Sequence, residues 1–223
     1  MQKLDKAFID KAFYHQAVSD LYNDVLYKLC KDHPDHIKDD VIVAKTLIIG
    51  RVYAAALERR RIKSEASDDA STPSDSFYIK VADKFKKSQI DLWLRDLSKL
   101  NNEIDDHQEI AISVHKKLVD LLKNITGMEK RSFASKYLHF HFKDYFYIYD
   151  SISDKSVREI SKREGIKLNR NRNRMGQNQN ADAVYTDHYA RCQKLNECMK
   201  GKYGRLLTPR ELDKVLLYWG NPG

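Results

Sequence analysis

The sequence predicts an all-α fold, and three observations support that prediction. Apolar residues recur three to four positions apart over long stretches, which is the spacing that lines one face of a helix. The 223 residues include only 8 glycines and 4 prolines, too few for the many tight turns of a sheet-rich fold. Apolar residues make up 42% of the chain, enough for one large domain or for two small lobes that share a core.

The helical spacing divides the chain into a series of elements. The first helix should end at His33-Pro34-Asp35, because proline disfavours a helical residue before it. The last should begin at Thr208-Pro209-Arg210-Glu211, a capping box with proline at the first helical position. Residues 77–85 form either a helix or a short extended piece. The predicted helices are 4–31, 38–61, 88–100, 109–122, 152–164, 181–200 and 208–219, with a central basic helix after Gly127.

Two polar stretches are predicted to be surface loops. Residues 64–76, SEASDDASTPSDS, are acidic and rich in serine. Residues 167–180, KLNRNRNRMGQNQN, alternate arginine with asparagine and have no apolar period. The acidic loop should face away from a polyanion, whereas the basic loop could follow one or could simply be solvated.

The charge of the chain favours a nucleic-acid partner. The formal net charge is +8 and the isoelectric point is about 9.2. Residues 131–180 carry 11 Lys and Arg against 5 Asp and Glu, so +6 of that charge lies in fifty residues. An enzyme that acts on nucleic acid needs such a field to bind phosphates.

The cysteines and the apolar runs exclude several classes of protein. Cys30, Cys192 and Cys198 are too few and too scattered for a disulfide framework, a zinc site or a four-cysteine iron–sulfur cluster, so we expect reduced thiols. No apolar run approaches about 20 residues, so no membrane span is expected. The first residues enter a charged helix without a signal-peptide core, which favours a cytoplasmic protein.

Residues 132–151, SFASKYLHFHFKDYFYIYDS, hold the best candidate chemistry. A glycine turn at Gly127 precedes a basic helix with Lys136 near its start. An aromatic run then leads to Asp150 at the start of the next helix. This order over about residues 120–155 resembles the helix-hairpin-helix DNA glycosylases, in particular the small 8-oxoguanine-glycosylase-like branch.

The resemblance implies a two-lobed helical protein that extrudes a damaged or modified base from DNA into a pocket between the lobes. It implies that Asp150 assists cleavage of the N-glycosidic bond. Lys136 would either attack the sugar C1′ to form a Schiff base, with strand cleavage to follow, or bind a phosphate. We expect DNA as the partner, a monomer, no membrane contact and no cofactor.

The residues themselves leave two readings of Asp150. A carboxylate at a helix start is favoured by the exposed N–H groups and by the helix dipole. Ser151 together with Asp154 could supply that cap, which would leave Asp150 free. A free carboxylate against aromatic side chains would stabilise a cation that develops on the sugar.

Further residues are candidates for DNA contact. Gly127, Arg131 and Ser132 lie at or before a helix start, where backbone N–H groups point at an anion. Three basic-loop side chains could follow the DNA backbone: Arg170, Arg172 and Arg174. His139 and His141 lie two apart on a helix and so cannot bind one metal, but either could line a base pocket.

Two other functions remain open. A non-catalytic helical DNA-binding protein would agree with a hairpin turn that has Gly127 as its one glycine. A HEPN-type ribonuclease needs an arginine and then a histidine with four to six residues between them, and the nearest pair, Arg131 and His139, has seven residues between them.

Overall fold

The structure is a computed structural model that describes residues 3–15, 17–58, 74–99, 104–168 and 180–221. All regular secondary structure in these ranges is helical, so the predicted all-α class is confirmed. None of the described helices is long and apolar enough to cross a membrane. The described helices are α1 (Lys6–His15), α2 (Ala17–Asp32), α3 (Asp39–Leu47), the π-helix η1 (Ile48–Val52), α4 (Ser74–Lys86), α5 (Ile90–Ser98), α6 (Ile104–Thr126), α7 (Arg131–His141), α8 (Ser151–Arg163), α9 (Ala183–Tyr203) and α10 (Pro209–Gly220).

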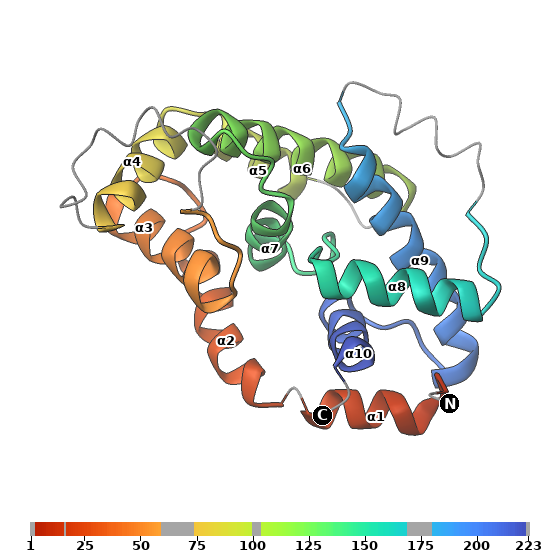
Figure 1. Ribbon diagram of the computed structural model, residues 1–223. Coiled ribbons are helices and arrows are strands. Elements are labelled where there is room, and N and C mark those ends of the chain that lie inside the picture. The colour runs from red at the N-terminus through yellow and green to blue at the C-terminus, as the bar shows by residue number, and fades with distance from the viewer. Residues whose placement is uncertain (1–2, 16, 59–73, 100–103, 169–179, 222–223) are drawn as a thin grey trace.

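The buried apolar side chains form two clusters. The first cluster is built by α2 to α7, and the second by α1, α8, α9 and α10. Helix α9 joins them, because Tyr185 and Tyr189 enter the first cluster while Cys192 and Leu195 enter the second. Figure 1 shows the consequence: the first helix of the chain packs beside the last, and α7 lies near the middle of the molecule.

The predicted helix over 4–31 is corrected to two helices, α1 and α2. Its apolar spacing continues through both, but Ile9 and Ala12 of α1 enter the second cluster, whereas Leu26 and Cys30 of α2 enter the first. A single straight helix could not bury both sets. Apolar periodicity in the sequence predicts that one face of a helix is buried. It does not predict which of the two clusters buries that face.

The predicted helix over 38–61 is also corrected. The α-helical part ends at Leu47, a π-helical turn runs to Val52, and an irregular stretch follows. Glu58 lies in a turn, and residues 59–61 of the predicted helix lie outside the described residues. Residues 77–85 are helical, as part of α4. The predicted helices at 88–100, 109–122, 152–164, 181–200 and 208–219 correspond to α5, α6, α8, α9 and α10 with shifted ends.

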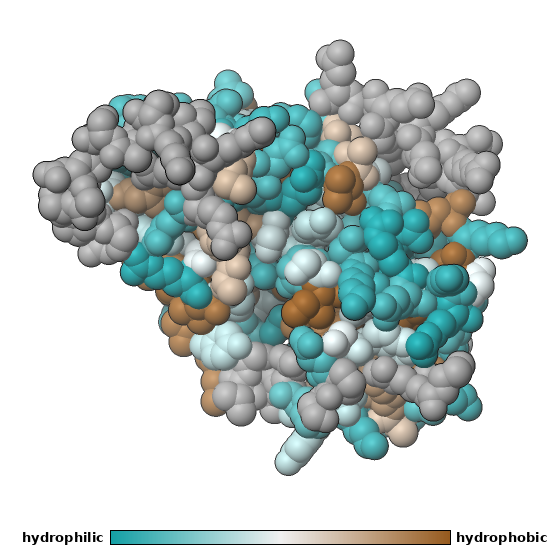
Figure 2. All heavy atoms as spheres, in the orientation of Figure 1, coloured by the Kyte–Doolittle hydropathy of each residue, from teal (hydrophilic) through white to brown (hydrophobic). Residues whose placement is uncertain are grey.

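The glycine turn joins α6 to α7 as predicted. Gly127 has φ 71° and donates its N–H to the carbonyl of Lys123 at 2.7 Å, which closes the end of α6. Eight consecutive residues of α7, 133–140, are buried, because other elements surround this short helix. Hydrophobic side chains reach the face seen in Figure 2 only in separate patches among hydrophilic ones.

The two predicted loops fall largely outside the description. Residues 64–73 of the acidic loop and 169–179 of the basic loop lie outside the described residues. Residues 74–76, assigned to the acidic loop, form the first turn of α4.

Candidate functional site

Lys136 and Asp150 form an ion pair between α7 and the start of α8. Lys136 Nζ lies 3.3 Å from Asp150 Oδ2 and donates to the carbonyl oxygen of Tyr53 at 3.2 Å. The two side chains are 10% and 21% exposed, so the pair lies at the edge of the interior rather than deep within it. The fold therefore brings together the two residues that the sequence singles out.

Asp150 is the N-cap of α8, which corrects the prediction that Ser151 and Asp154 leave it free. Its Oδ1 accepts the N–H groups of Ile152 at 3.0 Å and Ser153 at 2.9 Å, and the Ser153 hydroxyl accepts the Asp150 N–H in return. Oδ2 takes no part in this capping box and faces Lys136. The cap thus orients the carboxylate through Oδ1 and does not use Oδ2.

The charge state of Asp150 follows from these contacts. Burial raises its pKa, but the Lys136 ammonium and the hydrogen bonds of Ser153 outweigh burial and hold the pKa below its usual value. The carboxylate is therefore ionised at neutral pH.

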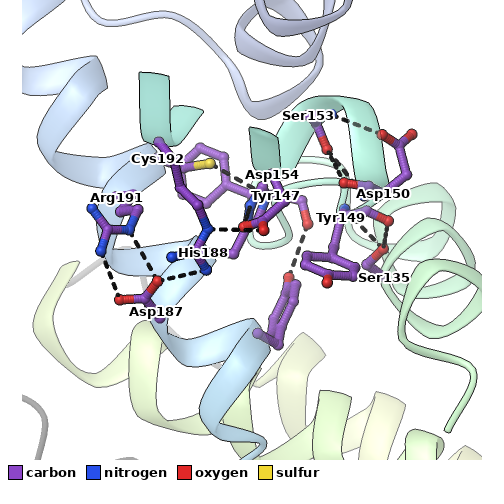
Figure 3. Close-up of polar contacts among 12 residues, drawn as sticks. Ser135, Tyr147, Tyr149, Asp150, Ser153, Asp154, Asp187, His188, Arg191 and Cys192 are labelled. Carbon is purple, nitrogen blue, oxygen red and sulfur yellow. Dashed lines mark hydrogen bonds and ion pairs between the residues drawn. The ribbon is translucent and has the colours of Figure 1, made fainter. Parts of the chain in front are cut away.

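The segment 145–149, which leads to Asp150, begins in a turn at Tyr145 and has no regular secondary structure after it. Each of its five carbonyl oxygens accepts a hydrogen bond from a side chain of α7 or α9 instead. The donors, in the order of the carbonyls from Tyr145 to Tyr149, are Tyr189, His139, Tyr185, His188 and Ser135. Several of these contacts appear in Figure 3. Side chains thus set the path of a segment that has no sheet partner.

His188 is a buried cation beside this segment. Its Nδ1 lies 3.3 Å from Asp154 Oδ1 and its Nε2 lies 3.0 Å from the carbonyl oxygen of Ile148, so both ring nitrogens face acceptors (Figure 3). Burial lowers the pKa of His188, but Cys192 and Asp154 raise it to about 10. The imidazolium therefore links α9 to α8 and to the segment before Asp150. Cys192 itself is buried and offers no thiol to a ligand.

Asp213 is a second carboxyl near the pair, and the sequence analysis missed it. Its side chain is 3% exposed, and Oδ2 accepts Arg210 Nη1 at 2.6 Å while the buried Oδ1 has no partner. Burial raises the pKa of Asp213 to about 6, Arg210 and Lys136 oppose that rise, and the charge of Asp150 adds to it. No local signal distinguishes this residue, which sits within an amphipathic helix.

Aromatic rings cluster around Tyr53, the residue whose carbonyl oxygen accepts Lys136 Nζ. The Tyr53 ring is 5.0 Å from Phe140 and 5.7 Å from Tyr22, and its hydroxyl donates to Asn23 at 2.5 Å. Tyr27 joins this cluster at 4.7 Å from Phe140. The rings come from α2, α7 and the stretch after η1, so sequence spacing could not have grouped them.

The two histidines of α7 have separate structural contacts. His139 is fully buried, with Nε2 2.6 Å from the Tyr27 hydroxyl and Nδ1 2.9 Å from the Phe146 carbonyl, so both nitrogens are used and no ring face is open to a base. Burial lowers its pKa to about 3. His141 stacks on His36 at 5.7 Å and lines a groove of about 1020 Å³ between α2, α5 and the end of α7. That groove does not include Lys136 or Asp150.

The basic residues of the hairpin bind other protein groups. Arg131 Nε donates to both oxygens of Asp182 at 2.9 and 2.7 Å, and its Nη2 donates to Glu129 at 2.5 Å. Lys123 also pairs with Glu129, at 3.1 Å. Gly127 and Ser132 are half-buried at this turn. The predicted phosphate role of Arg131 would thus require it to exchange partners. Arg131 pairs with carboxylates and His139 is buried with both ring nitrogens engaged, which argues against a HEPN-type pair of the two.

The three remaining DNA-contact candidates, Arg170, Arg172 and Arg174, lie outside the described residues. Among the residues that are described, no group of three histidine, cysteine or carboxylate side chains could hold a metal ion. Cys30, Cys192 and Cys198 are free thiols. A scan against protein-family models found no match, and neither the curated proteins nor the solved structures contained a significant one.

Proposed function

We propose that the chain is a DNA glycosylase that removes a damaged or modified base by cleaving its N-glycosidic bond. The observation that carries the proposal is the ion pair of Lys136 and Asp150, 3.3 Å apart at the edge of the interior, with the backbone of Tyr53 beside it and the Tyr53 ring packed on Phe140. The base would be extruded from the duplex toward these rings, because an enzyme cannot reach the bond inside the stack.

Asp150 has the features that this chemistry requires. As the base departs, the sugar becomes cationic, and an ionised carboxylate in a site partly shielded from water stabilises that charge. Two amide N–H groups hold Oδ1, so the carboxylate is oriented before substrate arrives and Oδ2 is directed at the site. Preorganisation of this kind is the main source of electrostatic catalysis.

Lys136 would hold the DNA rather than attack the sugar. Its amine contacts a carboxylate and a carbonyl, both of which are partners for an ammonium group. Lys136→Arg should therefore keep much of the base-release rate, and borohydride should trap no protein–DNA adduct. A trapped adduct that Lys136→Ala abolishes would instead assign Lys136 as a Schiff-base nucleophile.

The charge distribution supports DNA as the substrate. Residues 131–180 carry a net +6, and exposed lysines of this stretch, Lys143 and Lys155, flank the segment that ends at Asp150. Binding that neutralises phosphates should weaken steeply as salt rises, because counterions are released.

The deciding experiment incubates the protein with a panel of duplexes that carry oxidised, alkylated or otherwise modified bases and identifies released bases by mass spectrometry. Release of a base by the wild-type protein, and its loss in Asp150→Asn, would support the proposal. Salt-sensitive DNA binding without release from any duplex would contradict it and would favour a non-catalytic DNA-binding protein. Degradation of RNA would contradict it in favour of a ribonuclease.

A further inference from the structure

The backbone after α3 contains two uncommon features in succession. The helix widens into the π-turn η1, and the bonds that close it are long, with Tyr53 N–H to Ile48 O at 3.3 Å and Ala55 N–H to Ile49 O at 3.4 Å. Ala54 and Ala56 then take left-handed conformations, with φ of 51° and 44°. A Cβ atom disfavours that region, so these alanines hold conformations that glycine would adopt more readily.

Packing explains the glycine at the start of this segment but does not explain the left-handed alanines at its end. Gly50 lies inside η1, where an added Cβ would come within 2.6 Å of the Tyr78 hydroxyl, so close contact with α4 explains that glycine. The Ala54 and Ala56 side chains are exposed, and no contact of theirs accounts for the strained backbone. Strained residues of this kind and π-turns concentrate at functional sites.

The strained segment binds lysines of the central helix through its carbonyl groups. The carbonyl of Tyr53 accepts Lys136 Nζ at 3.2 Å, and the carbonyl of Ala56 accepts Lys130 Nζ at 2.6 Å. Ala54, the first strained residue, directly follows Tyr53. The turn at Ala54 thus helps to decide where the Tyr53 carbonyl points.

Lys136 Nζ therefore has two partners, one that lies earlier in the sequence and one that lies later. The Tyr53 carbonyl is 3.2 Å away and Asp150 Oδ2 is 3.3 Å away. The ring of Tyr53 is itself held by Phe140 at 5.0 Å and by its hydroxyl bond to Asn23. A long, flexible lysine side chain needs such contacts to stay in one geometry.

We propose that the segment 53–57 is a positioning element for Lys136: its strained backbone directs the Tyr53 carbonyl at Lys136 Nζ and so holds the ammonium beside Asp150. The effect on base release rests on the proposed function, whereas the positioning of Lys136 does not. Glycine tolerates these φ values but also many others, so it should relieve the strain and at the same time stop the backbone from fixing the Tyr53 carbonyl. Stability should therefore stay level or rise while the lysine loosens, and a purely structural turn would not show that combination.

The test replaces Ala54 and Ala56 by glycine, singly and together, in the full chain. The melting temperature should stay level or rise, because glycine adopts these φ values without steric cost. The Lys136 side-chain resonance, assigned in lysine-labelled protein by its loss in Lys136→Arg, should move in the double variant toward the shift of an unrestrained lysine. If the protein releases bases, the rate should fall by about 10- to 100-fold, because a misplaced Lys136 would hold the DNA less productively beside Asp150, and misplacement away from the reacting atoms costs on that scale.

Two matched variants separate backbone strain from other causes. Ala190→Gly makes the same change in the middle of α9 and should lower the melting temperature while the Lys136 resonance stays in place. Tyr53→Phe removes the hydroxyl bond to Asn23 but keeps the carbonyl, and should leave the Lys136 resonance in place.

Three results would overturn the inference. An unmoved Lys136 resonance in the folded double variant would show that the turn does not position the lysine. A lower melting temperature in both single glycine variants would show that the alanines are not strained. A shift in Tyr53→Phe as large as in the double variant would assign the effect to the ring. A moved resonance in a protein that releases no base would support the positioning role and reject only the glycosylase proposal.

Discussion

The Ser135 hydroxyl binds the backbone of Tyr149 on both sides of that residue: it accepts the Tyr149 N–H at 3.0 Å and lies 3.3 Å from the Tyr149 carbonyl oxygen, to which it donates. Ser135 and Tyr149 are the residues immediately before Lys136 and Asp150. One small, buried hydroxyl therefore sets α7 against the start of α8, and with it the distance between the two charged groups.

Ser135→Ala removes only one hydroxyl group, but it should disturb the placement of α7 against the start of α8. The Tyr149 N–H would lose its partner in a partly buried place, at a cost of about 1–3 kcal/mol in the free energy of unfolding. Base release should fall because the Lys136–Asp150 geometry loosens. Urea unfolding and base-release rates measure the two effects.

The chain offers a matched control for that substitution. Ser161 is also a buried helical serine, but its Oγ has no hydrogen-bond partner. Ser161→Ala should be neutral or stabilising and should leave base release unchanged. Equal effects of the two variants would show that the Ser135 hydroxyl has no special role.

Asp150→Asn should separate the charge of the site from the cap of α8. Asparagine caps helices about as well as aspartate, so the fold should survive, although loss of the ion pair with Lys136 should lower the melting temperature moderately. Loss of the negative charge should slow base release by about 100- to 1000-fold, the usual effect of one electrostatic group in an active site. DNA affinity should stay level or rise, because an anion is removed from the surface that faces phosphates.

Asp182 is the matched control for Asp150. It too caps a helix, by accepting the Tyr185 N–H at 2.9 Å, and it too pairs with a cation, Arg131. Asp182→Asn should lower stability without a change in the rate of base release. Full activity of Asp150→Asn would remove the main support for glycosylase chemistry, and a large fall in its melting temperature would make Asp150 structural.

Buried neutral histidines should make the protein sensitive to acid. Burial lowers the pKa of His115 and of His139 to about 3, whereas an unfolded chain binds these protons near pH 6.5. Their contribution to stability is complete above pH 6.5 and is lost as the pH falls toward 3. Each histidine should cost about 1.4 kcal/mol per pH unit in that window.

Urea unfolding at several pH values between 7 and 4 measures this slope. His115 stacks on Tyr185 at 3.5 Å, and its Nδ1 has no partner, so His115→Phe should keep the stacking and make the slope shallower. His33→Gln, at a half-exposed position, is the control. A slope that His115→Phe leaves unchanged would show that other groups cause the acid sensitivity.

The parts of the site that could be predicted from the sequence are those that local features mark. Gly127 marks a turn, Lys136 follows on a basic helix, and Asp150 begins a helix after an apolar run. The same local reasoning assigned the cap of α8 to the wrong residues, because Asp154 is engaged by His188 and only the tertiary fold shows that contact.

The remaining parts depend on contacts between distant elements. Asp213 is unusual only because α10 buries it near residues of α7 and α8. The strained turn at Ala54 interrupts a stretch whose apolar period predicts a continuous helix. At both places tertiary packing outweighs local preference. The spacing of residues in the sequence therefore predicts neither the buried carboxyl of Asp213 nor the turn at Ala54.

Asp213→Asn should stabilise the protein by an amount that grows as the pH rises from about 3.8 and is complete above about 6. Burial raises the pKa of this carboxyl to about 6 from an ordinary value of 3.8, so the folded chain holds a proton that the unfolded chain has released. The free energy of unfolding therefore falls as the pH rises from 3.8 through 6. At pH 7.5 this loss should reach roughly 3 kcal/mol. The groups that act on this carboxyl are Arg210, Asp150, Lys136 and His188, and asparagine can still accept the hydrogen bond of Arg210.

Urea unfolding of Asp213→Asn and wild type at pH 4 and pH 7.5 tests this dependence. The variant should gain stability at pH 7.5 and gain none at pH 4, where the wild-type carboxyl is already neutral. Asp154→Asn is a control of opposite sign: Arg158 and His188 hold the pKa of Asp154 below its usual value against the effect of burial, so its loss should destabilise at pH 7.5. A gain for Asp213→Asn that is equal at both pH values would assign the effect to packing and would show that Asp213 holds no proton near neutrality.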